Sequence, residues 1–432
     1  MEKTDEQILI QEQNASDRMV RLNALRQWQQ RYGAEYDNRG SRDVNCHIHT
    51  FYSFSPYSPT QAACRAKKEG LATAGIMDHD TIAGAREFIE AGLILDLPTT
   101  IGAECRVSFA DTPLAGRRIN NPDQDTIAYV AMHGVPHHQI DALMDWFSPI
   151  RTAREKRNRE MTKRLNALLE PADIHLDYEK DILPLSMAHE GGQVTERHLL
   201  FAVSLRLIDQ FGYGPELIAF LEQILSIKVS SKNRALLMDP GNPYLPYDLL
   251  GVLKSDLVEK CYIDATVDEC PPVAEAVRFA DDHGIILAYA YLGDVTDSVT
   301  GDKKPQTFED EYLDELMAVI KRLGFHAITY MPSRNTRAQL LRVRKLCEQH
   351  GLFEISGEDI NQPRQKFVCE VMRDPLFQNL YDAAWALIGH ELLATQDIQN
   401  GLFSRTSCMA EPDLNRRVEH YRNWALAHYG RS

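Results

Sequence analysis

Two histidines separated by one residue, His47 and His49 in the segment DVNCHIHT, are the residues whose spacing most clearly suits chemistry. The segment is typical of a short strand, in which side chains two residues apart project to the same face. Both imidazoles can therefore reach one ion. This spacing predicts a pair of metal ligands.

Further ligand-type residues each follow a short apolar run. They are Asp78, His79 and Asp80 in GIMDHDT, Glu104 in IGAEC, His133 in YVAMHGVP and Asp359 in ISGEDIN. In a parallel α/β barrel the active site lies at the carboxyl ends of the strands, so residues in these places would meet at one rim. The pattern therefore favours a metal-dependent hydrolase. His137, His138, His175, His189 and His326 lack this placement and are interpreted as ordinary surface or core residues.

Imidazole and carboxylate ligands together suit Zn, Mn or Fe, and the pattern does not choose among these divalent metals. One ion is expected and a second is left open, with Glu104 able to bridge two ions. A metal ion lowers the pKa of its bound water to ~7 and so supplies hydroxide at neutral pH. The alternatives are a single structural ion or none.

Composition narrows the class of protein. The 432 residues are 44% hydrophobic and 25% charged, and the formal net charge of -15 would repel a phosphate backbone, so no nucleic-acid partner is expected. No apolar run approaches ~20 residues, and the acidic start MEKTDEQ is unlike a secretory signal, so a cytoplasmic protein without a membrane partner is expected. A small substrate is favoured. The eight cysteines form no CxxC pair and are read as buried apolar residues.

A repeated order of helix, glycine, apolar strand and polar strand end predicts an α/β fold. Gly70, Gly284, Gly324 and Gly351 end the helices, and Ser58, Thr307 and Thr336 are placed at helix starts. This order implies parallel strands joined by helical crossovers. Seven strands are predicted, near 44–49, 73–78, 99–104, 127–133, 285–291, 325–331 and 352–357. A distorted seven-stranded barrel is favoured over an open sheet, because no glycine-rich dinucleotide motif follows any strand.

The predicted organisation has five parts. They are an N-terminal helical extension at 1–40, the first part of the barrel at 41–149, an inserted helical subdomain at 150–270, the second part of the barrel at 271–369 and a C-terminal helical extension at 370–432. The insertion is predicted because the span is too long for a structureless loop. Trp385 and Trp424 in the last part are expected to pack against the barrel. The basic segment from Arg151 to Arg164 is interpreted as a solvated helix face.

The order HIHT, MDHDT, GAE, a strand-end histidine and a late GED resembles the PHP superfamily of polymerase and histidinol phosphatase domains, over roughly residues 43–365. Within the insertion, REKRNREMTKRLNALL and VTERHLLFAVSLRL are similar to the small-molecule phosphoesterases of that superfamily. The resemblance implies a distorted seven-stranded barrel. It also implies that His47, His49, Glu104 and Asp359 hold one metal, that Glu104 and His133 contribute to a second, and that His79 belongs to a third.

The chain departs from that superfamily's pattern at three ligand positions. Phe54 occupies a position where the superfamily usually has an aspartate. Tyr289 or Tyr291 lies where a histidine is usual, and Asn361 replaces the histidine that usually follows two residues after the aspartate, here Asp359. The first metal site alone keeps its full set of ligands. A protein that holds one ion is therefore as plausible an expectation as a multinuclear enzyme.

Arg197 and His198 match the Arg-His element of the resembled phosphoesterases, and Arg334 follows the sixth predicted strand. Arginine forks fit phosphate oxygens, so these three residues are candidates for substrate binding. Asp78 or Asp80 is assigned a role in proton transfer. The favoured function is a phosphoesterase that acts on a small phosphorylated molecule. The alternatives are a barrel that binds a metal or a phosphorylated ligand without turnover, and a hydrolase of an amide or ester bond.

Overall fold

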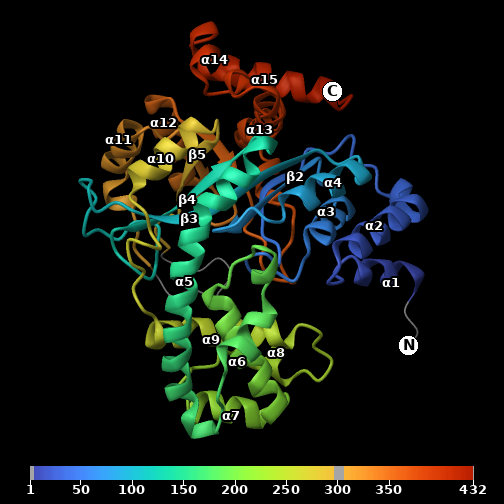
Figure 1. Ribbon diagram of the computed structural model, residues 1–432, viewed down its shortest axis with the longest axis vertical. Coiled ribbons are helices and arrows are strands. Elements are labelled where there is room, and N and C mark those ends of the chain that lie inside the picture. The colour runs from blue at the N-terminus through green and yellow to red at the C-terminus, as the bar shows by residue number, and fades with distance from the viewer. Residues whose placement is uncertain (1–3, 296–305, 432) are drawn as a thin grey trace.

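The computed structural model describes residues 4–295 and 306–431 and contains one seven-stranded sheet in the order β1 to β7 (Figure 1). The strands are β1 Val44–Ile48, β2 Thr73–His79, β3 Thr99–Ser108, β4 Ile127–His133, β5 Ile286–Ala290, β6 Ala327–Tyr330 and β7 Phe353–Ser356. Beyond β7, Ile360 bridges to Ile48 and its carbonyl accepts a hydrogen bond from the amide of His49 at 3.0 Å. The sheet is thereby nearly closed, and the predicted seven-stranded α/β barrel is confirmed.

The expectation that every strand runs parallel is wrong at one strand. β4 lies antiparallel to both β3 and β5, whereas every other pair is parallel. The physical reason lies in the connections. The segment between β3 and β4 contains no helix to carry the chain back across the barrel, so the two strands form a hairpin with a long loop. His133, at the carboxyl end of β4, therefore does not lie on the rim that the parallel strands form.

Five helices cover the outer face of the barrel. They are α3 Pro59–Lys68, α4 Ala85–Leu95, α10 Val273–Asp282, α11 Leu313–Leu323 and α12 Arg337–His350. The predicted caps are present at both ends. The Ser58 hydroxyl accepts the amide of Gln61, Thr336 forms a capping box with Gln339, and Gly351 adopts the left-handed conformation. The helix expected from Thr307 begins instead at Leu313, because the amide of Phe308 is bound by the side chain of Asp294.

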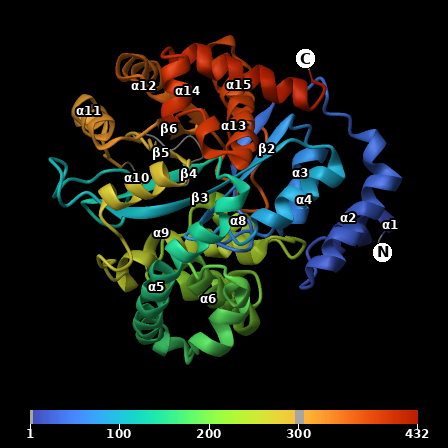
Figure 2. The same cartoon turned by 45° about the horizontal axis from the view of Figure 1, so that its top comes forward.

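The insertion forms a separate helical lobe at one end of the barrel (Figures 1 and 2). Its helices are α5 Ile140–Leu169, α6 Glu196–Phe211, α7 Pro215–Gln223, α8 Ser231–Met238 and α9 Leu245–Cys261. Residues from these helices bury their own apolar core, which one barrel residue, Phe54, joins. α5 extends across the boundary predicted at 149/150. The lobe lies at the carboxyl ends of the parallel strands, since Asp80, just after β2, pairs with Arg154 of α5.

The two chain ends pack on other sides of the barrel. The N-terminal helices α1 Asp5–Glu12 and α2 Arg18–Tyr32 lie beside α3 and α4. The C-terminal helices are α13 Gln378–Gln396, α14 Arg405–Ala410 and α15 Leu414–His428. Short 3-10 turns lie at Gly33–Glu35, His137–Gln139, Glu170–Ala172, Leu183–Leu185, Ala188–Glu190, Asp310–Tyr312, Glu370–Arg373, Pro375–Phe377 and Ile398–Asn400, and a π turn lies at Tyr178–Ile182. None of the described helices is long and apolar enough to cross a bilayer.

Helix α13 closes the amino end of the barrel, opposite the insertion (Figure 1). Trp385 of α13 is fully buried and packs with inward-facing alanines of the strands, among them Ala131, Ala288 and Ala327. The carboxylate of Glu391 accepts hydrogen bonds from the Thr100 hydroxyl at 2.7 Å and the Ile101 amide at 2.8 Å, at the start of β3. Trp424 of α15 packs against the same cluster. Trp385 therefore packs against the barrel as expected, whereas Trp424 is partly buried at the edge of this cluster.

A buried network of ion pairs joins the insertion to the barrel. Its members are Arg106 on β3, Arg154 and Arg157 on α5, Asp80 after β2, Glu196 at the start of α6, and Glu269 before α10. The Arg157 guanidinium lies 2.5 Å from Glu196 and 2.7 Å from Glu269, and Glu269 also pairs with Arg106. The interpretation of the basic helix as a solvated face is therefore wrong for Arg154 and Arg157, whose charges are matched by these carboxylates.

Glu269→Gln should lower the free energy of unfolding by about 3–5 kcal/mol, because it leaves Arg106 and Arg157 with one buried negative charge fewer. Urea denaturation followed by circular dichroism measures the change. Glu259→Gln, an exposed substitution on α9, is the matched control and should leave stability within ~0.5 kcal/mol. Equal stability of the two variants would contradict a structural role for the network.

A second buried carboxylate lies outside β5. The Tyr289 hydroxyl donates to Glu309 Oε1 at 3.1 Å, and the Leu292 amide donates to the same oxygen at 2.9 Å. Glu309 Oε2 is buried and has no hydrogen-bond partner among the described residues. Burial raises the pKa of Glu309 to about 7, and the amide and hydroxyl donors offset this only in part.

Glu309 should make stability depend on pH. The folded chain holds a proton on this carboxyl that the unfolded chain loses near pH 4.5, so the free energy of unfolding falls as pH rises from about 4.5 to about 7. Glu309→Gln removes this loss. The stability of the variant relative to wild type should therefore rise by up to about 3 kcal/mol between pH 5 and pH 8. Thermal unfolding of both proteins across this range measures it, with exposed Glu311→Gln as control; a difference that stays constant with pH would contradict the assignment.

Candidate metal centre

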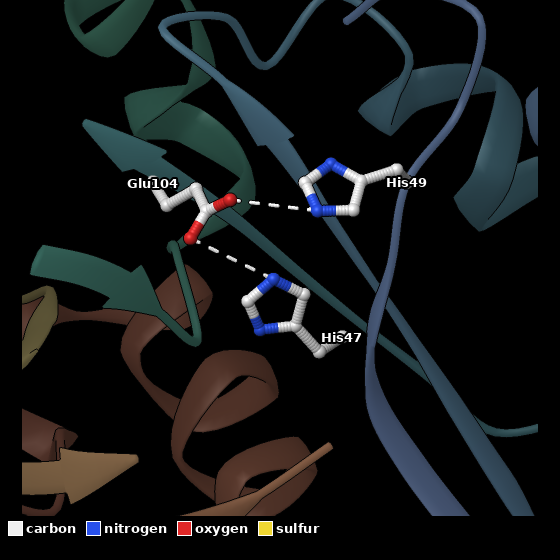
Figure 3. A group of neighbouring side chains, drawn as sticks. All are labelled: His47, His49 and Glu104. Carbon is white, nitrogen blue, oxygen red and sulfur yellow. Dashed lines mark ion pairs between the residues drawn. The ribbon is translucent and has the colours of Figure 1, made fainter. Parts of the chain in front are cut away.

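His47, His49 and Glu104 converge inside the barrel (Figure 3). His47 lies in β1, His49 follows that strand directly, and Glu104 lies in the middle of β3. His47 Nε2 is 3.6 Å from Glu104 Oε2, and His49 Nε2 is 3.4 Å from Glu104 Oε1. One ligand atom from each of the three residues lies within 4.8 Å of the others. The spacing argument from the sequence therefore brings both histidines to one carboxylate.

Two further predicted ligands touch this group. His79 Nδ1 lies 3.1 Å from Glu104 Oε1, and Asp359 Oδ1 lies 3.1 Å from His49 Nε2. His79 pairs in register with Glu104 across β2 and β3, and residues that pair in parallel strands share a face of the sheet. The structure thus places five of the six predicted metal ligands in one contact group.

His133 approaches from deeper in the barrel. It follows Met132, which pairs with Ala103, so it lies one layer further from the insertion than Ala131, which pairs with Glu104. Its side chain is buried, and Nε2 has no hydrogen-bond partner among the described residues. Burial lowers the pKa of His133 to about 3, with His47 acting in the same direction and Glu104 opposing it. His133 is therefore held as a neutral imidazole close to the group.

The electrostatics favour ionised carboxylates in contact with imidazole rings. Burial disfavours the charge on Glu104, but His79, His47 and His49 outweigh it and lower the pKa of Glu104 to about 2. The pKa of Asp359 is lowered well below its ordinary value, since His49, His47 and Arg197 together outweigh its burial. Burial lowers the pKa of His79 to about 3 despite the opposing charge of Glu104.

This donor set fits a divalent metal. His133 Nε2 is buried and makes no hydrogen bond within the described part of the chain, whereas His49 Nε2 and His79 Nδ1 each meet a carboxylate oxygen at 3.1 Å. A buried imidazole nitrogen without a partner costs free energy, which coordination of a cation would remove. Mixed imidazole and carboxylate donors are those of zinc, manganese and iron sites. The residues that could hold such an ion are His47, His49, Glu104 and Asp359, with His79 and His133 beside them.

The two aspartates to which the sequence assigned proton transfer lie behind this group. Asp78 pairs with Ala103, whose side chain packs on the outer face, and its carboxylate accepts hydrogen bonds from Thr50 and Ser53. Asp80 adopts a positive φ of 52° and pairs with Arg154 at 2.5 Å. Among the described contacts, neither carboxylate meets the three residues of Figure 3. Their proposed catalytic role rests on the sequence pattern alone.

The candidate substrate-binding residues divide into two kinds. Burial lowers the pKa of Arg197 and of Arg334. In both residues the negative charge of Asp359 opposes this shift. Both guanidinium groups therefore lie near the same end of the candidate centre. Arg197 NH1 is buried and has no hydrogen-bond partner among the described residues. His198 instead accepts the Thr195 amide at 2.9 Å and packs edge-on against Phe54. Arg197 is thus available to a ligand, whereas His198 caps α6.

The side chains at the three positions where the chain departs from the PHP pattern each contact other residues. Phe54 packs against Phe201 and Tyr247 in the insertion, where an aspartate would be buried without a cation. Tyr289 and Tyr291 lie in the cluster outside the barrel and donate hydrogen bonds to Glu309 and Asp310. The Asn361 side chain donates to Asp359 Oδ1 at 2.5 Å. Of these, Asn361 alone touches the candidate centre.

One contact of His49 escaped the sequence reasoning. Ser53 Oγ lies 3.2 Å from His49 Nδ1, on the side of the ring away from Glu104. The sequence offers one signal for this contact, the separation of four residues between His49 and Ser53. A chain that turns after a strand can place a serine hydroxyl next to an imidazole four residues earlier.

Two solved structures are among those that resemble this chain. No protein-family model and no curated protein matches the chain. A protein of Bifidobacterium adolescentis, provisionally described as a metal-dependent phosphoesterase, is 20% identical with a TM-score of 0.48, over 77% of this chain and 94% of that one. An amidohydrolase of Chromobacterium violaceum with bound sulfate and no metal is 18% identical with a TM-score of 0.48, over 78% of this chain and 96% of that one. Likeness at this level does not determine the chemistry of a site.

Proposed function

We propose that this chain is a metal-dependent hydrolase of the PHP type that cleaves a phosphoester in a small molecule. The observation that carries the proposal is the meeting of His47, His49 and Glu104 around one point, with ligand atoms within 4.8 Å of one another. Asp359 and His79 extend the group. The buried His133 Nε2, which has no partner among the described residues, supplies the second support, because a cation would satisfy it.

Each residue has a distinct task in this proposal. His47, His49, Glu104 and Asp359 would hold one divalent ion, Glu104 and His133 would contribute to a second, and His79 would belong to a third. An ion held there would act as a Lewis acid and bring the pKa of a water molecule close to neutral. The insertion, which lies over the carboxyl ends of the parallel strands, would limit the substrate to small molecules.

Arg197 and Arg334 favour an anionic substrate. Both guanidinium groups are partly buried, and burial lowers the pKa of each, so neither charge is fully compensated by the protein. Arg334 Nε donates a hydrogen bond to the Leu292 carbonyl, and its other donors have no hydrogen bond among the described contacts. A phosphate group offers several acceptors to such donors and matches the guanidinium fork. A substrate without negative charge would leave both arginines unpaired.

Phe54 and Asn361 favour a second candidate, a barrel that holds one ion and binds a phosphorylated ligand without turnover. Phe54 gives no metal ligand, and Asn361 donates to Asp359 and so occupies one of its oxygens. A hydrolase of amide or ester bonds is the third candidate, since metal-activated water attacks carbonyl carbon as well as phosphorus. The arginines favour a phosphoester over these bonds.

Protein purified without added metal should contain about one divalent ion per chain, and His47→Ala or Glu104→Gln should lower this content at least fivefold by removing a ligand. Elemental analysis measures the content. His175→Ala, an exposed histidine in the insertion, is the control and should retain the ion. Equal metal content in all four proteins would contradict the proposed centre.

Arg197→Ala should raise the KM for a phosphomonoester about 10–100-fold and weaken inhibition by inorganic phosphate to a similar degree, because one charge-assisted contact is lost. Steady-state kinetics on the substrates found in a screen of nucleotides and sugar phosphates measures both. Arg206→Ala, which loses only an exposed pair with Asp181, is the control. Hydrolysis of amides or carboxyl esters with no phosphatase activity would support the third candidate instead, and intact ligand after long incubation would support the second.

A further inference from the structure

A chain of hydrogen bonds runs from His49 to a carboxylate outside the barrel. His49 Nδ1 lies 3.2 Å from Ser53 Oγ, and Ser53 Oγ lies 2.6 Å from Asp78 Oδ1. All three residues are buried, with at most 1% of each exposed. His49 Nε2, the other ring nitrogen, faces Glu104 and Asp359. The two nitrogens of this ring therefore meet different surroundings.

The direction of the chain follows from the donors around Asp78. The Thr50 amide, which can only donate, lies 2.7 Å from Asp78 Oδ1, and the Thr50 hydroxyl lies 2.6 Å from Oδ2. The Thr50 hydroxyl also accepts the Tyr52 amide at 3.3 Å, so its own hydrogen is free to point at Asp78. Both carboxyl oxygens of Asp78 therefore act as acceptors in these contacts.

Ser53 has a single hydrogen to donate, and Asp78 receives it. The alternative acceptor, the Thr50 carbonyl, is 3.5 Å from Ser53 Oγ, against 2.6 Å for the carboxylate. Toward His49, Ser53 can then act only as an acceptor. His49 Nδ1 must therefore carry a hydrogen, and Nε2 is the nitrogen whose lone pair can coordinate a cation.

We propose that Ser53 and Asp78 are positioning residues that fix His49 in the Nδ1–H tautomer and hold Nε2 ready to coordinate the ion. The inference rests on the proposed metal-dependent function and deepens it. A hydrogen-bonded ligand histidine is held both in tautomer and in orientation, and loss of such a partner costs 10–100-fold in metal affinity. Asp78 thus has a place in the site although it faces away from the ion.

The loop that carries Ser53 is tied to the insertion. The Tyr52 hydroxyl donates to Glu190 at 2.9 Å, and the Tyr52 carbonyl accepts the Gln193 amide. Phe54, on the other side of Ser53, packs in the apolar core of the insertion. The neighbours of Ser53 are therefore fixed from both sides, which keeps its hydroxyl within reach of His49 without a contact to the ion.

Zn²⁺ affinity, measured by competition with a chelator, tests whether Ser53 and Asp78 position His49. Ser53→Ala should weaken Zn²⁺ binding 10–100-fold. Asp78→Asn should weaken it less than Ser53→Ala, because the amide oxygen can still accept from Thr50 and Ser53. Ser204→Ala is the matched control, since it also removes a fully buried hydroxyl, one that donates to the Leu200 carbonyl far from His49. If folded Ser53→Ala bound Zn²⁺ with the affinity of the wild type, the proposal would be overturned.

The tautomer itself is a second readout that does not depend on metal or on activity. Two-bond ¹H–¹⁵N spectra of metal-free protein labelled in histidine should show Nδ1 of His49 protonated in wild type, with the signal assigned by its absence in His49→Ala. Ser53→Ala should change that pattern and Ser204→Ala should not. An Nδ1 without a proton in wild type would overturn the proposal even if Ser53→Ala fails to fold. Absence of Zn²⁺ binding in wild type would sink the proposed function, while the spectrum would still decide the tautomer.

Discussion

The centre of this structure depends on one constraint, the need to compensate the buried charge of Glu104. A carboxylate enclosed in a barrel is costly unless cations or donors surround it. Here the surrounding groups are imidazoles, His79 from the strand β2, His47 from the neighbouring strand β1 and His49 from the residue just after β1. An imidazole nitrogen can either carry a proton or offer its lone pair to a metal ion. The same arrangement therefore suits a proton shared between a ring and the carboxylate, or a metal ion bound between them. The geometry of the ligands is therefore set by the strands before any ion arrives.

The rest of the fold holds these strands in place from both ends. At the amino end, α13 fills the barrel with Trp385 and pins β3 through Glu391, below the level of Glu104. At the carboxyl end, the insertion is joined by the buried arginine and carboxylate network. Glu196, which that network fixes, directly precedes Arg197. The ion pairs that attach the insertion thus also fix the backbone beside Arg197, the residue proposed to bind the substrate.

The fold class and the meeting of the main candidate ligands could be predicted because both depend on local regularities. The alternation of side chains along a strand placed His47 and His49 together, and the repeated helix, glycine and strand order gave the barrel. The antiparallel β4 could not be predicted in this way, since its direction depends on a helix that is missing from the β3–β4 loop. The burial of Arg154 and Arg157 was missed because a charged helix looks solvated until Glu196 and Glu269, distant in sequence, are brought to it.

In the segment MDHDT, adjacent residues face opposite sides of the sheet. Alternation along β2 requires neighbouring residues to face opposite sides, so His79 turns to Glu104 and Asp78 must turn away. An aspartate next to a ligand is therefore a poor candidate for direct contact with the same ion. It can nevertheless act on the site through the loop that returns beside it, because Ser53 bridges the outer face of β2 to the ring of His49. The acidic residue of such a motif and its histidine then serve one centre from opposite sides of a single strand.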